Sequence, residues 1–260
     1  MSTDAGRWYA RGRRADLLVV VVALLTRIAV LVTGSDAPTF EYPVVDAATY
    51  DQAARALASG EGLDWRFFWQ PFLYPVGLGA LYSVSGGSIV FAKVVQLLLG
   101  VATCWFTLRV GRRHLGSGAG LVAGLICALH GPMIFFETEL LATGWATFWA
   151  IVLIDRLTGA SGQDRPANWA LTGALAAIAV LTRPTFLPAV IVAVLWVLVR
   201  SRTWKPAIPA VAAFVVVVAP VIVLGSSVAQ HASFLPASGA MNLYLGNHPE
   251  PCETLTIRPG

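Results

Sequence analysis

Long apolar runs alternate with short polar segments along most of the chain. An α-helix needs about 20 apolar residues to cross a bilayer, or about 17 at the short end of the range. The runs that reach or approach this length are 16–33, 88–108, 118–136, 139–156, 169–182, 185–200 and 207–225. The run 169–182 is short and needs residues from its flanks to span. The pattern predicts an all-α fold, a polytopic membrane helix bundle with about seven spans.

A further apolar run, 71–86, is harder to interpret. It contains Pro71 and Pro75 together with several glycines, and these make it a poor straight span. Cytoplasmic loops of membrane proteins are rich in Lys and Arg. If 71–86 crossed the membrane, every later span would be inverted and strong basic clusters would lie outside. We therefore expect 71–86 to form a juxtamembrane or re-entrant helix that packs on the bundle.

The basic residues form short clusters between the apolar runs. These clusters are Arg7, Arg11, Arg13 and Arg14; Arg109, Arg112 and Arg113; and Arg200, Arg202 and Lys205. With a cytoplasmic N-terminus, each cluster falls on the inner side of the membrane. The polar segments on the outer side are then 35–70, 137–139, 183–184 and 226–260. We expect a multi-pass protein of the cell membrane (inner or plasma membrane), with its informative chemistry on the outer face.

This topology divides the chain into parts. Residues 1–15 are the predicted cytoplasmic N-terminus, and 16–225 the transmembrane bundle with its outer loop 35–70. Residues 226–260 are predicted to form an extracytoplasmic loop, and the early end of the sequence there suggests a truncated chain. A signal peptide over 7–33 is the alternative for the first run. We expect an uncleaved helix instead, because the apolar stretch is long and Arg27 interrupts it.

Composition agrees with a membrane protein. The chain is 57% hydrophobic and 12% charged, with a mean hydropathy of +0.69. A soluble domain is usually about a quarter charged. The net charge of +4 does not indicate nucleic acid as a partner, because no basic stripe with interleaved aromatic residues is present. We expect membrane lipids, and no nucleic acid, among the partners.

Asp46 is the first candidate for chemistry. The residues after it, Ala47–Ser59, have helical spacing, and Tyr50 lies on their apolar face. Such a helix would lie along the membrane with Asp46 near its N-cap. Asp46 therefore has two interpretations, a helix cap or an active-site carboxylate. Asp51 and Arg55 are spaced i, i+4 and predict a surface ion pair.

Charged residues also stand at the other outer turns. Glu137 and Glu139 lie where one apolar run ends and the next begins, and ionisable groups at membrane depth tend to mark functional sites. Acids at the start of a helix are the simpler explanation. Arg183 lies at an outer helix end, where it would bind an anionic ligand, pair with an acid or snorkel to headgroups. Arg27, within the first span, either snorkels or pairs inside the bundle.

Polar residues near these acids are candidates for binding substrate. They are Tyr50, Gln70 and Asn247. Gln70 sits within a string of aromatic residues that most simply form an interfacial belt, with substrate stacking as the alternative. The aromatic residues are Trp65, Phe67, Phe68, Trp69, Phe72 and Tyr74. The sequence contains no HExxH, P-loop or GxSxG motif.

The order of several segments resembles a known family. After the basic N-terminus and first span come "LASGEG", "QPFLYPVGLGALYSVSGGS", "FFETELLATGWATFW", "LTRPTFLP" and "GAMNLYLGNHP". This order is similar to that of the membrane glycosyltransferases of the C-type fold, specifically the family-39 group. That group includes protein O-mannosyltransferases and bacterial lipid A aminoarabinose transferases. The resemblance covers most of the chain, although members of the group usually run well beyond this length.

The resemblance implies transfer of a sugar from a polyprenyl-phosphate donor to a protein or lipid acceptor outside the cytoplasm. It implies a catalytic aspartate in the first outer loop, matched by Asp46, and acids in the second outer turn, matched by Glu137 or Glu139. A basic residue near the third outer turn, here Arg183, would hold the donor phosphate. Some members use a divalent metal, so Mg²⁺ or Mn²⁺ is a predicted cofactor, with Asp46 and Glu139 as candidate ligands.

Two other functions fit the sequence. A transporter or flippase of a lipid-linked substrate predicts polar residues buried within several spans, and broken helices with repeat symmetry. Here the polar groups collect on one face, which favours the enzyme. A membrane scaffold or inactive fragment is the other alternative, because the chain is short for the family.

Overall fold

The computed structural model describes residues 3–159, 165–230 and 232–248, and the regular elements within those ranges are all helices. The longer ones are α1 (Thr3–Gly34), α6 (Ile89–Leu115), α7 (Ser117–Leu129), α8 (Gly131–Thr138), α9 (Ala142–Thr158), α10 (Pro166–Thr182), α11 (Leu187–Ser201) and α12 (Ala207–Ala229). The shorter ones are α2 (Pro38–Glu41), α3 (Asp46–Ala58), α4 (Arg66–Trp69), α5 (Leu73–Ser85), the 3₁₀ helix η1 (Pro184–Phe186) and α13 (Ser238–Asn247). The predicted all-α fold is confirmed. The last part of the predicted outer loop, 249–260, lies outside the described residues.

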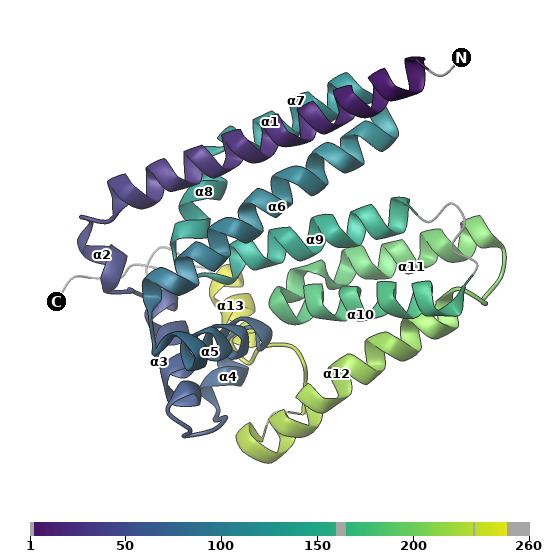
Figure 1. Cartoon of the computed structure of the whole chain (residues 1–260). Helices are drawn as coiled ribbons and strands as arrows, with labels where there is room; N and C mark the ends of the chain where they lie inside the picture. Colours follow the sequence, from purple (N-terminus) through teal and green to yellow (C-terminus); the bar gives the residue numbers. More distant parts are fainter. Residues whose placement is uncertain (1–2, 160–164, 231, 249–260) are drawn as a thin grey trace.

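The long helices run back and forth between two ends of the molecule (Figure 1). The start of α1, the turns α6–α7 and α11–α12, the last residues of α9 and the first residues of α10 lie at one end, and α2 to α5 lie at the other. Ion pairs tie helices together at the first end, where Asp155 of α9 lies 3.1 Å from Arg109 and 3.0 Å from Arg113 of α6. The basic clusters therefore gather at one end, as the sequence predicts.

Fewer helices qualify as membrane spans by their length and composition than the pattern of apolar runs predicts. Three described helices are long and apolar enough to cross a membrane: Arg14–Gly34 within α1, α6 and α12. The pair α7 and α8 makes a fourth candidate, a broken span or re-entrant loop bent by 50° at His130. The described segments Pro166–Thr182 and Pro184–Val199 are apolar but shorter. Of the roughly seven spans that the sequence predicts, three or four are therefore supported by helix length and composition.

The segment 71–86 forms α5, which packs on the bundle. Its 13 residues give a helix about 20 Å long, well short of the roughly 30 Å of a hydrocarbon core. Gly79 allows α5 to approach α3, because a Cβ there would lie 2.7 Å from Leu57 Cδ2 and 3.3 Å from the carbonyl oxygen of Ala54. The contact with α3 agrees with the prediction that this segment packs on the bundle, and its position beside the membrane stays a prediction.

Small residues also bring the long helices together. A Cβ on Gly120 of α7 would lie 2.5 Å from the backbone nitrogen of Arg112 in α6, and one on Gly173 of α10 would lie 1.9 Å from the carbonyl oxygen of Ala210 in α12. Close approach at small residues is the usual packing of helices in lipid, where dispersion contacts replace the hydrophobic effect. These contacts hold α7 against α6, and α10 against α12.

The aromatic string does not form the expected surface belt. Phe67 and Phe68 of α4 and Phe72 are buried in one cluster with Ala177 and Leu181 of α10. Tyr74 is fully buried in a second cluster, and Trp65, at 60% exposed, is the member of the string that faces outward. Most of these rings are therefore core residues that anchor the outer loop on the long helices.

Candidate active site

Asp46 is the first residue of α3, and it does not cap that helix. The N-cap is Val45, and no side chain accepts a hydrogen bond there. The exposed carboxylate of Asp46 instead accepts a hydrogen bond of 3.1 Å from Nε2 of Gln70. Val45 has φ 54° and ψ −122°, a strained conformation for a β-branched residue. The backbone thus holds Asp46 at a defined position facing Gln70, which favours a site over a cap.

Tyr50 lies one helical turn after Asp46 and is buried. Its ring packs edge-on against Tyr74 of α5, with centroids 4.8 Å apart. Burial raises the pKa of Tyr50 well above its usual value, the charge of Asp46 raises it further, and the charge of Arg183 opposes both. An acid from α3 and a cation from the end of α10 therefore both act on one phenol, although they are far apart in the sequence.

Tyr74, the ring that packs against Tyr50, connects Tyr50 to the turn before α9. Its hydroxyl donates to Oε1 of Gln96 in α6 at 2.6 Å. Gln96 Nε2 in turn donates to the backbone oxygens of Glu137 at 3.0 Å and Glu139 at 2.7 Å. Trp145 of α9 packs edge-on against Tyr74, with centroids 5.6 Å apart. This chain of contacts fixes the turn against the juxtamembrane helices.

Glu139 is the acid of that turn which faces the site. It has extended backbone between α8 and α9, and its side chain is half-buried. Burial is the main cause that raises the pKa of Tyr74, and the charge of Glu139 contributes in the same direction. The charges of Asp46 and Arg183 thus act on Tyr50, and the charge of Glu139 acts on Tyr74, the ring that packs against it.

Glu137 faces the interior instead. Its carboxylate accepts two hydrogen bonds from Arg27 of α1, 2.8 Å from Nε and 2.9 Å from Nη2, and the two side chains are 2% and 1% exposed. The carboxylate lies over Gly100 of α6, where a Cβ would be 2.1 Å from Oε2. Of the two interpretations of Arg27, pairing within the bundle is therefore correct. Glu137 thus has a structural partner, which leaves Asp46 and Glu139 as the candidate acids of the site.

Arg183 follows the last residue of α10 and is exposed. Its Nη1 donates to Oγ1 of Thr143 in the first turn of α9 at 3.0 Å. Within the part of the chain that the structure describes, no carboxylate lies within 4.0 Å of this guanidinium. Thr143 also lines a cavity of about 190 Å³ together with His130 and Glu137. The cation is held in place at the site and is not neutralised by an acid.

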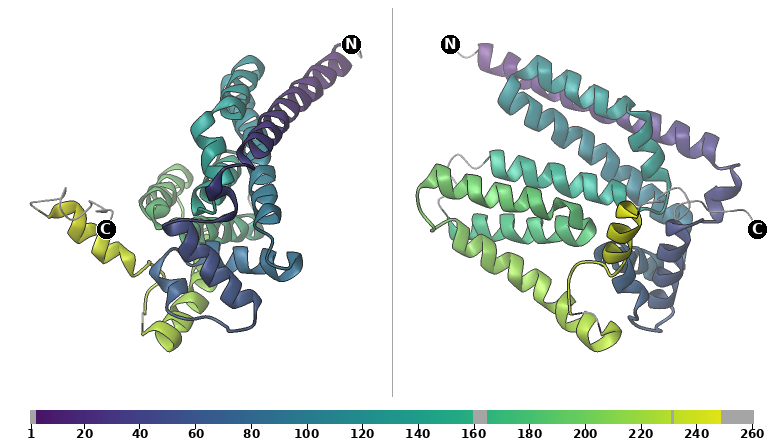
Figure 2. Two further views of the ribbon diagram at one scale, coloured as in Figure 1. Left: turned by 90° about the vertical axis from the view of Figure 1, so that its left-hand side faces the viewer. Right: turned by 180° about the vertical axis from the view of Figure 1, so that it is seen from behind.

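Asn247 is not joined to this group. Its Nδ2 donates to the backbone oxygen of Leu243 within α13, and the side chain is exposed. Across the described ranges, no hydrogen bond or ion pair links Asn247 to the other predicted site residues. Figure 2 shows α13 projecting away from the short helices in its left view. The backbone bond from Ala237 to Phe68, at 2.8 Å, attaches the segment before it.

Several polar residues near the site were not predicted. Lys93 of α6 is 2% exposed, donates to the backbone oxygen of Phe40 at 2.8 Å, and lies 4.0 Å from the centre of that ring. The ion pair between Asp51 and Arg55 was predicted, but the hydrogen bond that Asp51 accepts from the buried Tyr82 was not. Lys93 stands three residues before Gln96 in the apolar run 88–108, so the two residues lie on the same face of that helix. Two polar residues on one face of a membrane span are the feature of the sequence that could have identified them.

The comparisons with known proteins identify a family. Residues 70–224 match the model of the family described as dolichyl-phosphate-mannose-protein mannosyltransferase. The chain belongs to this family. It is a family of membrane glycosyltransferases that use a lipid-linked sugar donor. No curated protein and no solved structure matches the chain.

The segment that matches this mannosyltransferase family contains part of the site. Gln70, Glu139 and Arg183 lie within it, whereas Asp46 and Tyr50 come before it. The hydrogen bond between Gln70 and Asp46 connects the two parts. The family match therefore supports the C-type glycosyltransferase assignment, and the geometry adds the first outer loop to the site.

The predicted Mg²⁺ or Mn²⁺ needs side chains that can bind it. Among the described residues, no three His, Cys, Asp or Glu side chains lie close enough together to hold a metal ion. Mg²⁺ is often held by one or two carboxylates, with substrate phosphates and water completing its shell. Asp46 and Glu139 stay the predicted candidate ligands, and metal use stays a prediction.

Proposed function

We propose that this chain transfers a sugar from a polyprenyl-phosphate carrier to a hydroxyl group of a protein or lipid acceptor, on the outer face of the cell membrane. The observation that supports the proposal is that the charges of Asp46 and Arg183 both act on the Tyr50 phenol, with Asp46 held by Gln70 and Arg183 by Thr143. A carboxylate and a free guanidinium at one site are the two groups that this transfer requires.

In the proposed reaction, the acceptor oxygen forms a bond with the anomeric carbon of the sugar, and the bond from that carbon to the carrier phosphate breaks. Asp46 accepts the proton of the acceptor hydroxyl. Arg183 stabilises the negative charge that develops on the departing phosphate. Gln70 orients the Asp46 carboxylate, and Thr143 positions Arg183.

Glu139 is proposed to bind sugar or acceptor hydroxyls opposite Asp46. Its backbone is fixed by Gln96, so its side chain is presented from a rigid turn. If Mg²⁺ or Mn²⁺ binds, Asp46 and Glu139 are the carboxylates that would hold it, and the ion would supply positive charge near the donor phosphate.

The proposed topology has a cytoplasmic N-terminus and about seven crossings, with α9, α10 and α11 crossing as shorter helices. The gathering of the basic turns at one end supports this orientation. A cysteine in place of Glu61, whose side chain is 66% exposed, should react with an impermeant thiol reagent added outside intact cells. Labelling only after the cytoplasmic face is opened would reverse the orientation.

The activity is tested with membranes that contain the chain and radiolabelled polyprenyl-phosphate sugars. Asp46→Asn should lower transfer by about 10²–10⁴-fold, the usual contribution of a positioned base. Asp36→Asn is the matched control, because Asp36 is an exposed acid of the same outer segment. Equal transfer by Asp46→Asn and wild type would remove Asp46 from the chemistry.

A further inference from the structure

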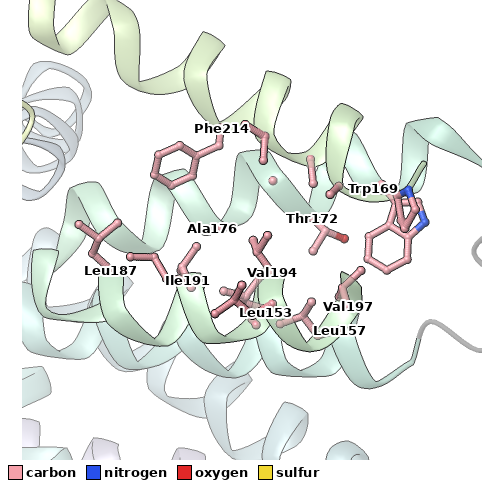
Figure 3. A pocket seen from close by; sticks show the side chains of 18 residues that line it. Leu153, Leu157, Trp169, Thr172, Ala176, Leu187, Ile191, Val194, Val197 and Phe214 are labelled. Atoms are coloured by element: carbon pink, nitrogen blue, oxygen red, sulfur yellow. The ribbon is translucent and has the colours of Figure 1, made fainter. Parts of the chain in front are cut away.

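Two cavities in the helix bundle differ in the side chains that line them. The larger, about 280 Å³ between α9, α10, α11 and α12, is lined almost wholly by hydrocarbon, such as Ile191 and Val194 (Figure 3). The smaller, about 190 Å³, lies at the bend between α7 and α8, and His130 and Met133 are among its lining residues. The smaller cavity therefore has donor atoms beside it that can bind more than an apolar group.

Met133 is one of three sulfur-containing residues that meet at this bend. The thiol of Cys127, in the last turn of α7, donates to Sδ of Met133 in α8 at 3.9 Å. The Cys127 thiol also shares a hydrogen bond with the thiol of Cys104 in α6. Both cysteines are free, Cys104 is fully buried, and Cys127 is half-buried. Three sulfur atoms thus converge from three helices.

Three sulfur ligands select a soft cation. Thiolate and thioether groups favour Cu(I), whereas structural zinc sites take four ligands from Cys, His, Asp and Glu. Among the described residues, no three side chains of those four types lie close enough together for a metal ion. With metal–sulfur bonds of about 2.3 Å, two sulfurs of a trigonal site lie about 4.0 Å apart. The 3.9 Å between Cys127 and Met133 fits that arrangement.

We propose that Cys104, Cys127 and Met133 form a binding site for Cu(I) where α6, α7 and α8 meet. Binding of Cu⁺ releases the protons of both thiols, so two thiolates and one thioether hold the ion in a complex of charge −1. Arg27 supplies positive charge beside this complex, since its Nη1 contacts the backbone oxygen of Ala128 at 3.3 Å. The ion binds and leaves as Cu(I), so no redox step is required.

The bound ion would join the two sides of a bend. The axes of α7 and α8 differ in direction by 50°, and His130 lies between them, after Cys127 and before Met133. Bonds from one ion to both sides would fix this angle and attach it to α6. Since a ligand that binds the folded state stabilises that state, Cu(I) should raise the temperature of unfolding.

The test uses the purified full chain in nanodiscs, reduced and kept free of oxygen, with Cu(I) supplied by a coloured chelator. Wild type should remove one equivalent of Cu(I) from the chelator. Cys127→Ser and Met133→Leu should each lower the affinity by about tenfold or more. Cys252→Ser and Met241→Leu are the matched controls, because each removes the same kind of sulfur elsewhere in the chain, and Met241 is 51% exposed on α13.

X-ray absorption at the copper edge identifies the ligands directly. It should show three sulfur neighbours in wild type, and a shell that contains nitrogen or oxygen would overturn the proposal. Equal affinity of Met133→Leu and wild type, loss of binding in Cys252→Ser, or displacement of Cu(I) by an equal concentration of Zn²⁺ would also overturn it.

Thermal unfolding provides the control for folding. The metal-free variants are compared with wild type in the same nanodiscs, and a Cys127→Ser chain that misfolds is replaced by Cys104→Ala. Cu(I) should raise the unfolding temperature of wild type and of Met241→Leu, and should leave that of Cys127→Ser unchanged. These measurements need no sugar transfer, so the metal site and the proposed function stand or fail separately.

Discussion

The buried pair of Arg27 and Glu137 allows a quantitative prediction about stability. The two side chains are almost fully buried and share two hydrogen bonds of 2.8 and 2.9 Å. Arg27 Nη1 also contacts the backbone oxygens of Ala23 and Ala128 at 3.3 Å. Breaking a buried pair from one side costs about 3–5 kcal/mol, because a buried charge is left without a partner.

Glu137→Gln should therefore lower the free energy of unfolding by about 3–5 kcal/mol, equivalent to roughly a 10²–10⁴-fold shift in the folding equilibrium. The double variant Arg27→Met, Glu137→Leu should recover most of this loss, since replacing both charges with apolar side chains is often neutral. Reversible unfolding in mixed micelles, followed by circular dichroism in a double-mutant cycle, measures both effects.

The control is Arg55→Met, which breaks an ion pair whose arginine is 48% exposed and which should cost about 1 kcal/mol or less. The reasoning fails if Glu137→Gln unfolds like the wild type. A stable Glu137→Gln variant that has lost sugar transfer would return Glu137 to the chemistry, as the sequence first predicted.

Three further predictions concern the site and the outer loop. Arg183→Gln should lower kcat in sugar transfer by about 10²-fold or more, and Arg183→Lys should retain part of the wild-type kcat. An effect on KM alone would refute the role of Arg183 in stabilising the leaving phosphate. Gln96→Leu should cost about 1–3 kcal/mol in unfolding because the Glu139 carbonyl loses its donor, and Thr107→Val, elsewhere on α6, is its comparison. Burial alone would raise the pKa of Asp64, but its hydrogen bonds from Arg66 lower it overall. The contact is therefore present above about pH 4 and is lost as the pH falls. Cleavage near residues 60–66 by an acid-stable protease should increase at low pH in wild type, and Asp64→Asn should cleave equally at both pH values.

The hydrophobic pattern predicts the helices well because a helix in lipid depends mainly on an unbroken apolar run. The outer helix at Asp46 is also predictable, since Ala47, Tyr50 and Ala54 have helical spacing and are buried as expected. The relative placement of α3 and α10 could not be predicted, because it arises from packing between segments far apart in the chain.

The two acids show why site residues are harder to predict than helices. Glu137 is still in α8, whereas Glu139 follows its last residue in extended backbone. The helix ends between them, so that Glu137 pairs with Arg27 while Glu139 does not, and a sequence cannot locate that end within two residues. Lys93 was missed because the apolar residues around it dominate the hydropathy of its span.

The central claim, that Asp46 and Arg183 share one site, is tested most directly by cross-linking. A chain carrying cysteines in place of both residues, with Cys104, Cys127 and Cys252 replaced by serine, is treated in membranes with a short bifunctional thiol reagent. The pair Asp46→Cys, Arg183→Cys should cross-link efficiently, and the pair Asp46→Cys, Asn247→Cys should not. Absence of a cross-link between the first two positions, with both cysteines reactive toward a monofunctional reagent, would contradict the site.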